Sequence, residues 1–187
     1  MTSPPVFVTD RLTVRIAQAR DAALFLDLWN NPKVMSFVGF PHGLNLSSEQ
    51  VIQRLTRSKK TVFDRNLVIC TNLDSQSIGE CKLSQPDPES IVRPDVKLLP
   101  EFWGCGFGKE TWQAAVDYQF RHTDCETVEG SPNIHNHASI RMQESAGAKR
   151  MGKAVFHFPD DMPVQTVSVT HYIYQISRND WLKNQSG

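Results

Sequence analysis

The stretch Pro100-Glu101-Phe102-Trp103-Gly104-Cys105-Gly106-Phe107-Gly108-Lys109 decides the fold, because its three glycines separate two kinds of hydrophobic pattern. The segment 96–99 before it has the residues of a strand. After it, apolar side chains recur at the spacing of a helix, at Trp112, Ala115, Val116 and Phe120. Glycines allow a positive φ, and a helix start offers free N–H groups with a partial positive charge. The stretch therefore predicts an anion-binding turn between a strand and a helix.

A glycine turn alone does not identify the anion. The P-loop pattern GxxxxGK[ST] is absent from the sequence. A dinucleotide-binding fingerprint is expected early, in a βαβ unit, whereas this turn follows two segments that predict an antiparallel hairpin, 67–71 and 78–84. A strand-to-helix turn with no ligand and a nucleotide site of another type remain alternatives.

The rest of the chain predicts a mixed α/β sheet. We expect strands over 7–16, 67–71, 78–84, 96–99, 127–130, 148–158 and 164–176, and a loop with three prolines over 85–94. A first helix ends at Asn30-Asn31-Pro32, and a second begins with a capping box of Ser47 and Gln50, with Val51, Ile52 and Leu55 facing inward. A third helix follows the glycines, and a fourth runs from Asn136 to about Ala146, where Gly147 stops it.

The composition indicates one domain over residues 1–187, as a monomer or a homodimer. Lys plus Arg and Asp plus Glu both number 20, so no global field attracts nucleic acid or an anionic membrane. No apolar run reaches the ~20 residues of a membrane span, and residues 1–8 lack the features of a signal peptide. We therefore expect a cytoplasmic protein that binds neither nucleic acid nor membrane.

The cysteines and histidines do not form a metal-binding pattern. Cys70, Cys81, Cys105 and Cys125 show no CxxC spacing, which favours reduced core cysteines over a zinc site or a disulfide framework. His135 and His137 flank Asn136 without a third ligand nearby. We predict no metal site.

Four blocks in order carry a resemblance to a known family. Residues 96–108 resemble the acyl-CoA pyrophosphate loop of the GNAT superfamily of N-acetyltransferases, in the form Pro-x-x-Trp-Gly-x-Gly. Residues 133–148 resemble that family's later motif, in which Asn and then Ser precede a helix that ends in Gly. Thr9-Asp10-Arg11-Leu12 and Asn31-Pro32-Lys33-Val34 are similar to the branch that contains the ribosomal-protein alanine N-acetyltransferases.

The resemblance implies the GNAT fold: a mostly antiparallel mixed sheet, splayed in the middle, with helices on both faces and acetyl-CoA in the V-shaped gap. It also implies that backbone at Leu98 and Leu99 pairs with the pantetheine arm and that Asn136 contacts the cofactor. The pyrophosphate would be held by backbone N–H groups of Trp103, Gly104, Cys105, Gly106, Phe107, Gly108 and Lys109.

Acetyl transfer to an amine requires a base, because α-amines and lysines titrate near ~8 and ~10.4. Glu80 and Asp95 are the candidates, and we expect burial to raise the pKa of either carboxylate. A backbone N–H near Leu99 would polarise the carbonyl. Many relatives protonate the leaving thiolate with a tyrosine, and because Gln143 stands at that position here, Ser139 is the remaining donor.

Each role has a structural alternative. Glu80 and Asp95 could be solvent-facing strand carboxylates, and Ser139 a helix-start serine bonded to backbone. Cys105 is expected to fill space rather than act as a nucleophile, since direct transfer needs none. Glu101, where the family carries Arg or Gln, removes one cation from the loop. With the missing tyrosine, this substitution keeps open a catalytically silent acyl-CoA-binding or regulatory module.

The acceptor is left open by the sequence. A protein N-terminus, a polyamine or small metabolite, and an aminoglycoside-like antibiotic all present an amine. An acidic acceptor side would favour polycations, and the sequence shows no acidic cluster. A set of large apolar residues either packs the core or shapes the acceptor pocket: Trp29, Met35, Phe37 and Phe40.

Overall fold

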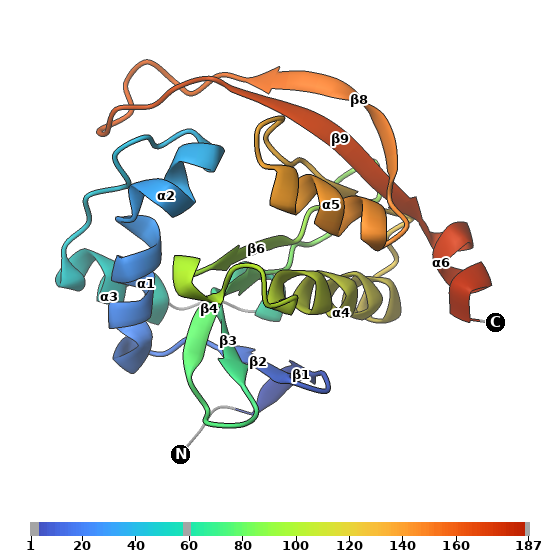
Figure 1. Ribbon diagram of the computed structural model, residues 1–187, viewed down its shortest axis with the longest axis horizontal. Helices are drawn as coiled ribbons and strands as arrows, with labels where there is room; N and C mark the ends of the chain where they lie inside the picture. Colours follow the sequence, from blue (N-terminus) through green and yellow to red (C-terminus); the bar gives the residue numbers. More distant parts are fainter. Residues whose placement is uncertain (1–3, 58–60, 186–187) are drawn as a thin grey trace.

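The computed structural model describes residues 4–57 and 61–185, and in it the strands form two sheets (Figure 1). The first has the strand order β1-β2-β3-β4-β6, with all neighbours antiparallel, and comprises β1 (Pro5–Val8), β2 (Leu12–Ile16), β3 (Leu67–Thr71), β4 (Ser77–Lys82) and β6 (Asp95–Leu98). The second has the order β5-β7-β9-β8 and comprises β5 (Ile91–Val92), β7 (Thr127–Gly130), β9 (Val169–Ser177) and β8 (Lys149–Phe156).

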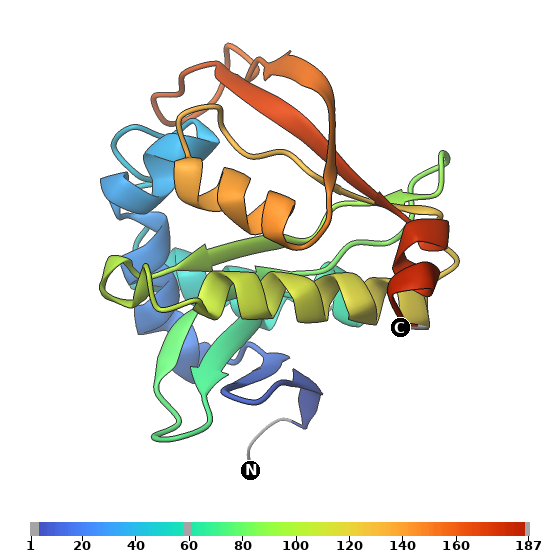
Figure 2. The same cartoon turned by 45° about the vertical axis from the view of Figure 1, so that its right-hand side comes forward.

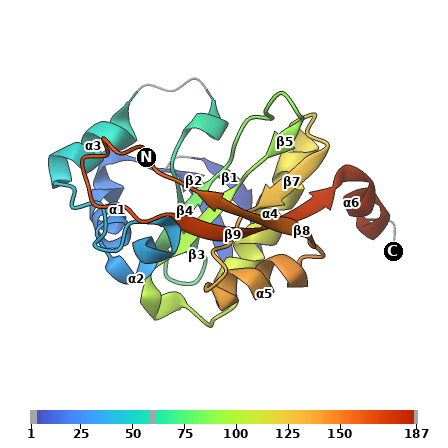
Figure 3. The ribbon, with the colours of Figure 1, turned by 90° about the horizontal axis from the view of Figure 1, so that it is seen from above.

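Six α-helices accompany the sheets in the described ranges: α1 (Ala22–Trp29), α2 (Pro32–Met35), α3 (Ser48–Thr56), α4 (Phe107–His122), α5 (His137–Ser145) and α6 (Arg178–Gln185). Short 3-10 turns flank them: η1 (Ala19–Asp21), η2 (Ser36–Val38), η3 (Val62–Asp64) and η4 (Pro100–Phe102). α1 and α3 lie at one end of the molecule and α6 at the other (Figure 3).

Helix α4 joins the two sheets into one core. Its Ala115 packs with Leu12, Ile69 and Ile78 of the first sheet, on the face opposite α1 and α3. Other apolar side chains of the helix pack with residues of the second sheet, at Trp112, Val116 and Phe120. Figure 2 shows α4 beneath α5, between the strands of the two sheets.

The sheets part between β6 and β7, which belong to different hydrogen-bonded sheets. Antiparallel pairing predominates, with β5 and β7 as the parallel pair. The predicted splayed GNAT architecture is therefore confirmed. The gap between β6 and β7 is where the candidate site lies.

Most predicted elements are present, and three predictions were wrong. The strand expected over 7–16 is a hairpin of β1 and β2, because Thr9 accepts a turn hydrogen bond from Leu12 N–H and reverses the chain. The loop expected over 85–94 contains β5. Ile52 is exposed, whereas Val51 and Leu55 pack inward as expected. The sequence reading did not identify α6, whose polar composition gives no clear apolar stripe.

Candidate active site

The glycine loop adopts the left-handed backbone that its composition allows. Gly104 and Gly106 have φ of +79° and +82°, and Gly106 is the N-cap of α4. The Trp103 indole Nε1 donates to the Leu98 carbonyl over 2.8 Å, which fastens the loop to the end of β6. The free N–H groups at the start of the 16-residue helix α4 therefore open toward the gap between the sheets.

Arg11 braces this loop from the far end of the first sheet. Its guanidinium donates to the Cys105 carbonyl over 3.1 Å, lies 4.7 Å from the Phe107 ring centroid and pairs with Glu110 at 2.6 Å. Thr9 also donates to Glu110, over 2.6 Å. Burial alone would raise the pKa of Glu110, but these hydrogen bonds and the Arg11 charge lower it. Thr9 and Arg11 thus hold the glycine loop and the start of α4 against the first sheet. The sequence indicated this segment only through its resemblance to a family and did not show this role.

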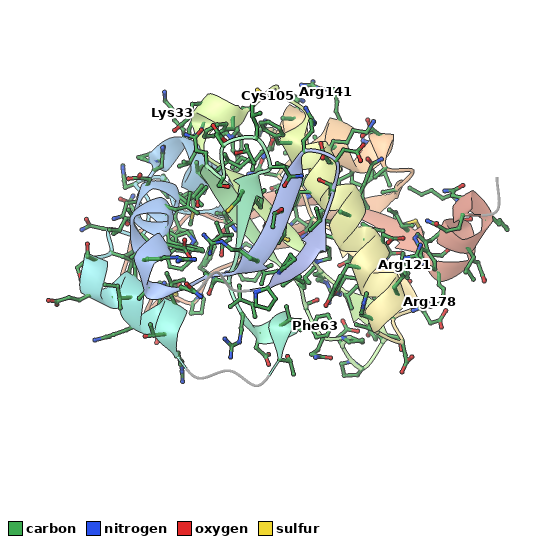
Figure 4. All side chains as sticks on the ribbon, turned by 90° about the horizontal axis from the view of Figure 1, so that it is seen from below. Lys33, Phe63, Cys105, Arg121, Arg141 and Arg178 are labelled. Carbon is green, nitrogen blue, oxygen red and sulfur yellow. The ribbon has the colours of Figure 1, made fainter. Side chains whose placement is uncertain are left out.

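A cavity of about 870 Å³ fills the gap between the sheets, and we name it the donor cavity because the sequence resemblance places acetyl-CoA there. Of the predicted site residues, those that line it are Asp95, Leu98, Trp103, Gly104, Gly106, Gly108, Lys109, Asn136 and Ser139. Leu99, Cys105, Phe107 and Glu80 are not among its lining residues. Arg141 of α5 adds a cation that the sequence reading did not single out. Figure 4 shows Arg141, Cys105 and Lys33 at the same edge of the molecule, with Arg121 toward the other end of α4.

The exposed edge of β6 presents Leu98, not Leu99. The Leu99 N–H donates to the Ile78 carbonyl of β4 over 3.0 Å, so the polarising N–H that the sequence places near Leu99 is not that of Leu99 itself. Neighbouring residues in an antiparallel ladder point their backbone groups to opposite sides, which turns the Leu98 N–H toward the gap. The Leu98 carbonyl is occupied by Trp103, and the Leu98 N–H is thus the donor available at this edge.

Helix α5 supplies polar groups from the opposite wall. Asn136 caps it, accepting from the Ser139 N–H over 3.1 Å. The Ser139 hydroxyl forms no hydrogen bond with any described residue, so it does not bond to the backbone as the alternative supposed. Gln143 is 3% exposed, lines the donor cavity, and its Oε1 has no hydrogen-bond partner among the described residues. A buried amide oxygen without a partner is costly unless a ligand or water satisfies it.

Glu80 is buried beneath the site rather than facing it. Its side chain is 1% exposed and accepts from Trp29 Nε1 over 2.8 Å and from Asn66 Nδ2 over 2.6 Å. Lys82 and Lys97 lie 3.5 and 4.0 Å from its oxygens. These four partners leave Glu80 in a structural network with no contact to either cavity.

Asp95 does face the site, with a side chain that is 44% exposed, but its pKa contradicts the prediction. Withdrawal of water alone would raise the pKa of this carboxyl. The adjacent Lys97 ammonium, which forms an ion pair with it, together with Lys82, instead holds the pKa below its usual value. The expectation of a raised pKa was therefore wrong for Asp95, because the sequence did not show how closely the lysine lies.

A second cavity of about 430 Å³ opens beside the first, and we name it the acceptor pocket because the sequence places the acceptor beside residues that line it. Val38, Asp95 and Lys97 line both cavities, so the two meet at β6. Trp29, Met35 and Phe40 line the acceptor pocket, whereas Phe37 lines the donor cavity. The large apolar residues selected from the sequence therefore do surround the cleft.

Three of the four cysteines are core residues, as predicted from the sequence. Cys70, Cys81 and Cys125 are buried, and burial raises the pKa of the Cys81 thiol. Cys105 is exposed at the loop and so is not a core cysteine. Within the described residues, no group of three or more His, Cys, Asp or Glu side chains is placed to hold a metal ion, and no helix has the length and apolarity to cross a membrane.

A glycine-rich helix start beside a splayed sheet, with a second cavity meeting the first, is the arrangement expected of an α/β enzyme that brings two substrates together. Residues 11–149 match the family model described as acetyltransferase (GNAT) domain, and the chain belongs to this family.

A curated relative named as an uncharacterized N-acetyltransferase p20, from Bacillus licheniformis, is 26% identical over 77% of this chain and 82% of its own. Among solved structures, spermidine N-acetyltransferase from Vibrio cholerae, in complex with CoA and spermine, aligns with a TM-score of 0.74 at 19% identity, covering 93% of this chain and 99% of that one. Ribosomal-protein-S5-alanine acetyltransferase from Vibrio fischeri aligns with a TM-score of 0.71 at 16% identity, covering 94% and 97%. These structural likenesses support the fold.

Proposed function

We propose that this protein transfers the acetyl group of acetyl-CoA directly to an amine. The observation that carries the proposal is the junction of the donor cavity and the acceptor pocket at Asp95 and Lys97. A thioester in the donor cavity and an amine in the acceptor pocket would meet at this point. The family membership and a neighbour crystallised with CoA agree with this donor.

The donor cavity has the chemistry that a CoA-type ligand requires. Its anionic end would lie against the backbone N–H groups of Gly104, Gly106, Gly108 and Lys109 and the side chains of Lys109 and Arg141. Gln143 Oε1, buried without a partner, offers an acceptor for an amide N–H of the pantetheine arm. Bound acetyl-CoA supplies the acetyl thioester, and the chain supplies orientation, a polarising donor and a path for protons.

The reaction forms a C–N bond and breaks a C–S bond, while the amine loses a proton and the thiolate gains one. The Leu98 N–H is the donor that would stabilise the carbonyl oxygen. The Ser139 hydroxyl, free of other hydrogen bonds among the described residues, would donate to the thiolate. Neither role requires a covalent enzyme intermediate, so Cys105 needs no part in the chemistry.

For the amine proton, Asp95 is the better of the two carboxylates. It lies where both cavities meet, whereas Glu80 is enclosed by four hydrogen-bonding or charged partners. A carboxylate with a lowered pKa is a weak base. Asp95 would therefore bind the substrate's ammonium group and direct the ammonium proton to water, and would not itself stay protonated.

We also propose a branch of the family, a domain organisation and a location for this protein. The Thr9-Asp10-Arg11 brace and the structural likeness to the Vibrio fischeri enzyme support membership in the ribosomal-protein alanine acetyltransferase branch. We further propose one domain over residues 1–187 and a cytoplasmic location. A silent acyl-CoA-binding module is the second candidate, favoured by Gln143 in place of a tyrosine acid.

A thermal-shift experiment with acetyl-CoA tests the donor site. Gly108 is the variant of choice because its backbone is unstrained, and an added Cβ would make only ordinary contacts with Met142 and Leu98 in the donor cavity. Acetyl-CoA at about 100 times its Kd should stabilise the wild type by about 2.7 kcal/mol, or about 5–10 °C. Gly108→Glu should abolish this shift through bulk and like charge.

The matched control is Gly152→Glu on β8, where an added Cβ meets nothing within 4 Å. This variant should retain the full shift. If folded Gly108→Glu protein is stabilised by acetyl-CoA as much as the control, the donor site lies elsewhere. A wild type that binds acetyl-CoA but acetylates no amine in a broad screen with free-thiol readout would favour the silent module.

A further inference from the structure

The acceptor pocket is unusual in the sign of its charges. Its charged lining residues are Arg54, Arg57, Lys82, Lys97 and Asp95. Four of these five side chains are cationic, although the whole chain has a formal net charge of zero. The chain therefore concentrates positive charge at this pocket.

The two lysines are compensated by carboxylates on the same strands. Glu80 lies opposite Lys97, and Lys82 lies opposite Asp95, in the β4–β6 register. Ion pairs link Lys82 to Glu80 at 3.5 Å and Lys97 to both carboxylates. This cross-strand quartet is neutral overall and is held in place by its own contacts.

The two arginines have no such compensation. Arg54 lies on α3, and Arg57 is its C-cap, so the two side chains project three residues apart from one helix surface. Neither forms an ion pair with a carboxylate in the described part of the chain. Arg54 instead lies over the Trp29 ring, 5.8 Å from its centroid, and thus borders the pocket wall.

The rest of the wall is apolar and limits the size of the occupant. Met35, Phe40 and Leu44 face the pocket beside Trp29. A volume of about 430 Å³ suits a small molecule, at the lower end of the range for ligand pockets. Arg54 and Arg57 line this pocket, and Asp95, where the acetyl group would arrive, lines the donor cavity as well.

We propose that the acceptor is a small amine that also carries a carboxylate or phosphate, and that Arg54 and Arg57 bind this anion. The inference rests on the proposed acetyl transfer. A polycation such as spermidine would bring its positive charges against two uncompensated guanidinium groups, which Coulomb repulsion disfavours. An anion gains charge-assisted and bidentate hydrogen bonds from the same groups. Asp95 would hold the ammonium end of such a molecule.

A kinetic comparison of matched amines tests this inference. Each pair differs only in the anionic group: phosphoethanolamine with ethanolamine, glucosamine 6-phosphate with glucosamine, and glutamate with its diamide. Spermidine serves as the polycation. In the wild type, kcat/KM should be at least about tenfold higher for an anionic member than for its neutral partner and for spermidine. The phosphate and carboxylate pairs show which anion the pocket prefers.

Variants assign the preference to the arginines. Arg54→Gln and Arg57→Gln should each lower the anionic-to-neutral ratio of kcat/KM about tenfold, mainly by raising KM for the anionic amine. Lys183→Gln on α6, at the other end of the molecule (Figure 3), removes a charge outside the pocket and should leave the ratio unchanged. If the arginines serve only the C-terminal carbonyls of α3, both variants would lower stability without changing the ratio, which overturns the inference.

Calorimetry on the CoA complex separates the possible failures. Phosphoethanolamine should bind more tightly than ethanolamine even if neither is turned over, and equal binding would overturn the inference. Efficient acetylation of spermidine with no preference for anions would also overturn it while leaving acetyl transfer established. Absence of any stabilisation by CoA would instead refute the proposed function on which the inference depends.

Discussion

At the scale of single residues, two carboxylates that look equivalent in the sequence have different environments. Glu80 and Asp95 both lie on strands next to the gap, but only Asp95 lines it. Glu80 accepts from the Trp29 indole and the Asn66 amide and so fixes the wall of the acceptor pocket. Periodicity could place both residues on strands, but it could not show which carboxylate the neighbouring side chains enclose.

Replacing Asp95 by asparagine should lower kcat/KM by about 10²-fold, because the ammonium loses its counter-ion and its proton path. Acetyl-CoA affinity should change little, and the loss should shrink toward high pH, where more of the amine arrives unprotonated. Steady-state rates between pH 6 and 10 measure this. A pH–rate profile that matches the wild type would exclude Asp95 from proton transfer.

Ser139→Ala should lower kcat by about 10–100-fold and leave the acetyl-CoA thermal shift intact, because the hydroxyl would act only on the departing thiolate. The Asn136 cap is made to the Ser139 backbone N–H and survives the substitution, so the fold of α5 should not change. Ser145→Ala, at the other end of α5, is the control. Normal turnover in Ser139→Ala would make Ser139 a helix-start residue only.

At the scale of elements, capping residues and hydrophobic periods predicted the structure well. The Ser47 and Gln50 capping box, the Asn136 cap and the apolar stripe of α4 are all present. Predictions failed where a contact distant in sequence decides the outcome. The turn between β1 and β2 is stabilised by Thr9, whose partner Glu110 lies on α4, and no local pattern indicates this pairing.

Arg11 links the turn between β1 and β2 to the glycine loop and to Glu110 of α4. Removing its guanidinium frees the glycine loop from the first sheet, so Arg11→Ala should weaken acetyl-CoA binding by about 1 kcal/mol, or about fivefold in Kd. Arg121→Ala removes a comparable exposed ion pair near the far end of α4 and should not affect the Kd (Figure 4). Calorimetric titration with acetyl-CoA measures the Kd of both variants. Equal affinities would show that the loop keeps its shape without Arg11.

At the scale of the whole molecule, the split between the sheets brings together residues that the sequence keeps apart. The donor cavity joins β6, the glycine loop and α5, and the acceptor pocket adds α1 and α3. Motifs could locate the glycine loop because its residues are contiguous in the chain. The cationic acceptor pocket was missed because Arg54 and Arg57 lie about 40 residues before the strand that they face.

Stability of the whole fold should depend on pH through its paired carboxylates, and Asp21 is one of the buried ones. Asp21 is 6% exposed in its side chain and pairs with Arg15 at 2.7 Å, linking β2 to the turn before α1. Burial alone would raise the pKa of Asp21, but Arg15 and the Gln18 N–H lower it. A lowered folded-state pKa contributes stability that is present above the unfolded pKa of about 3.9 and is lost as pH falls through the folded value.

Asp21→Asn should therefore cost about 3 kcal/mol at pH 7, because it leaves the mostly buried Arg15 guanidinium without a counter-charge. The difference from the wild type should narrow as pH falls below about 4, because the unfolded wild-type chain then takes up a proton at Asp21, and the folded carboxylate does so at a lower pH. Urea unfolding at pH 7, 5 and 3 measures it, with Asp180→Asn as the control, because exposed ion pairs such as Lys149–Asp180 contribute little to stability. A difference that stays constant down to pH 3 would mean that Asp21 acts through packing rather than through its charge.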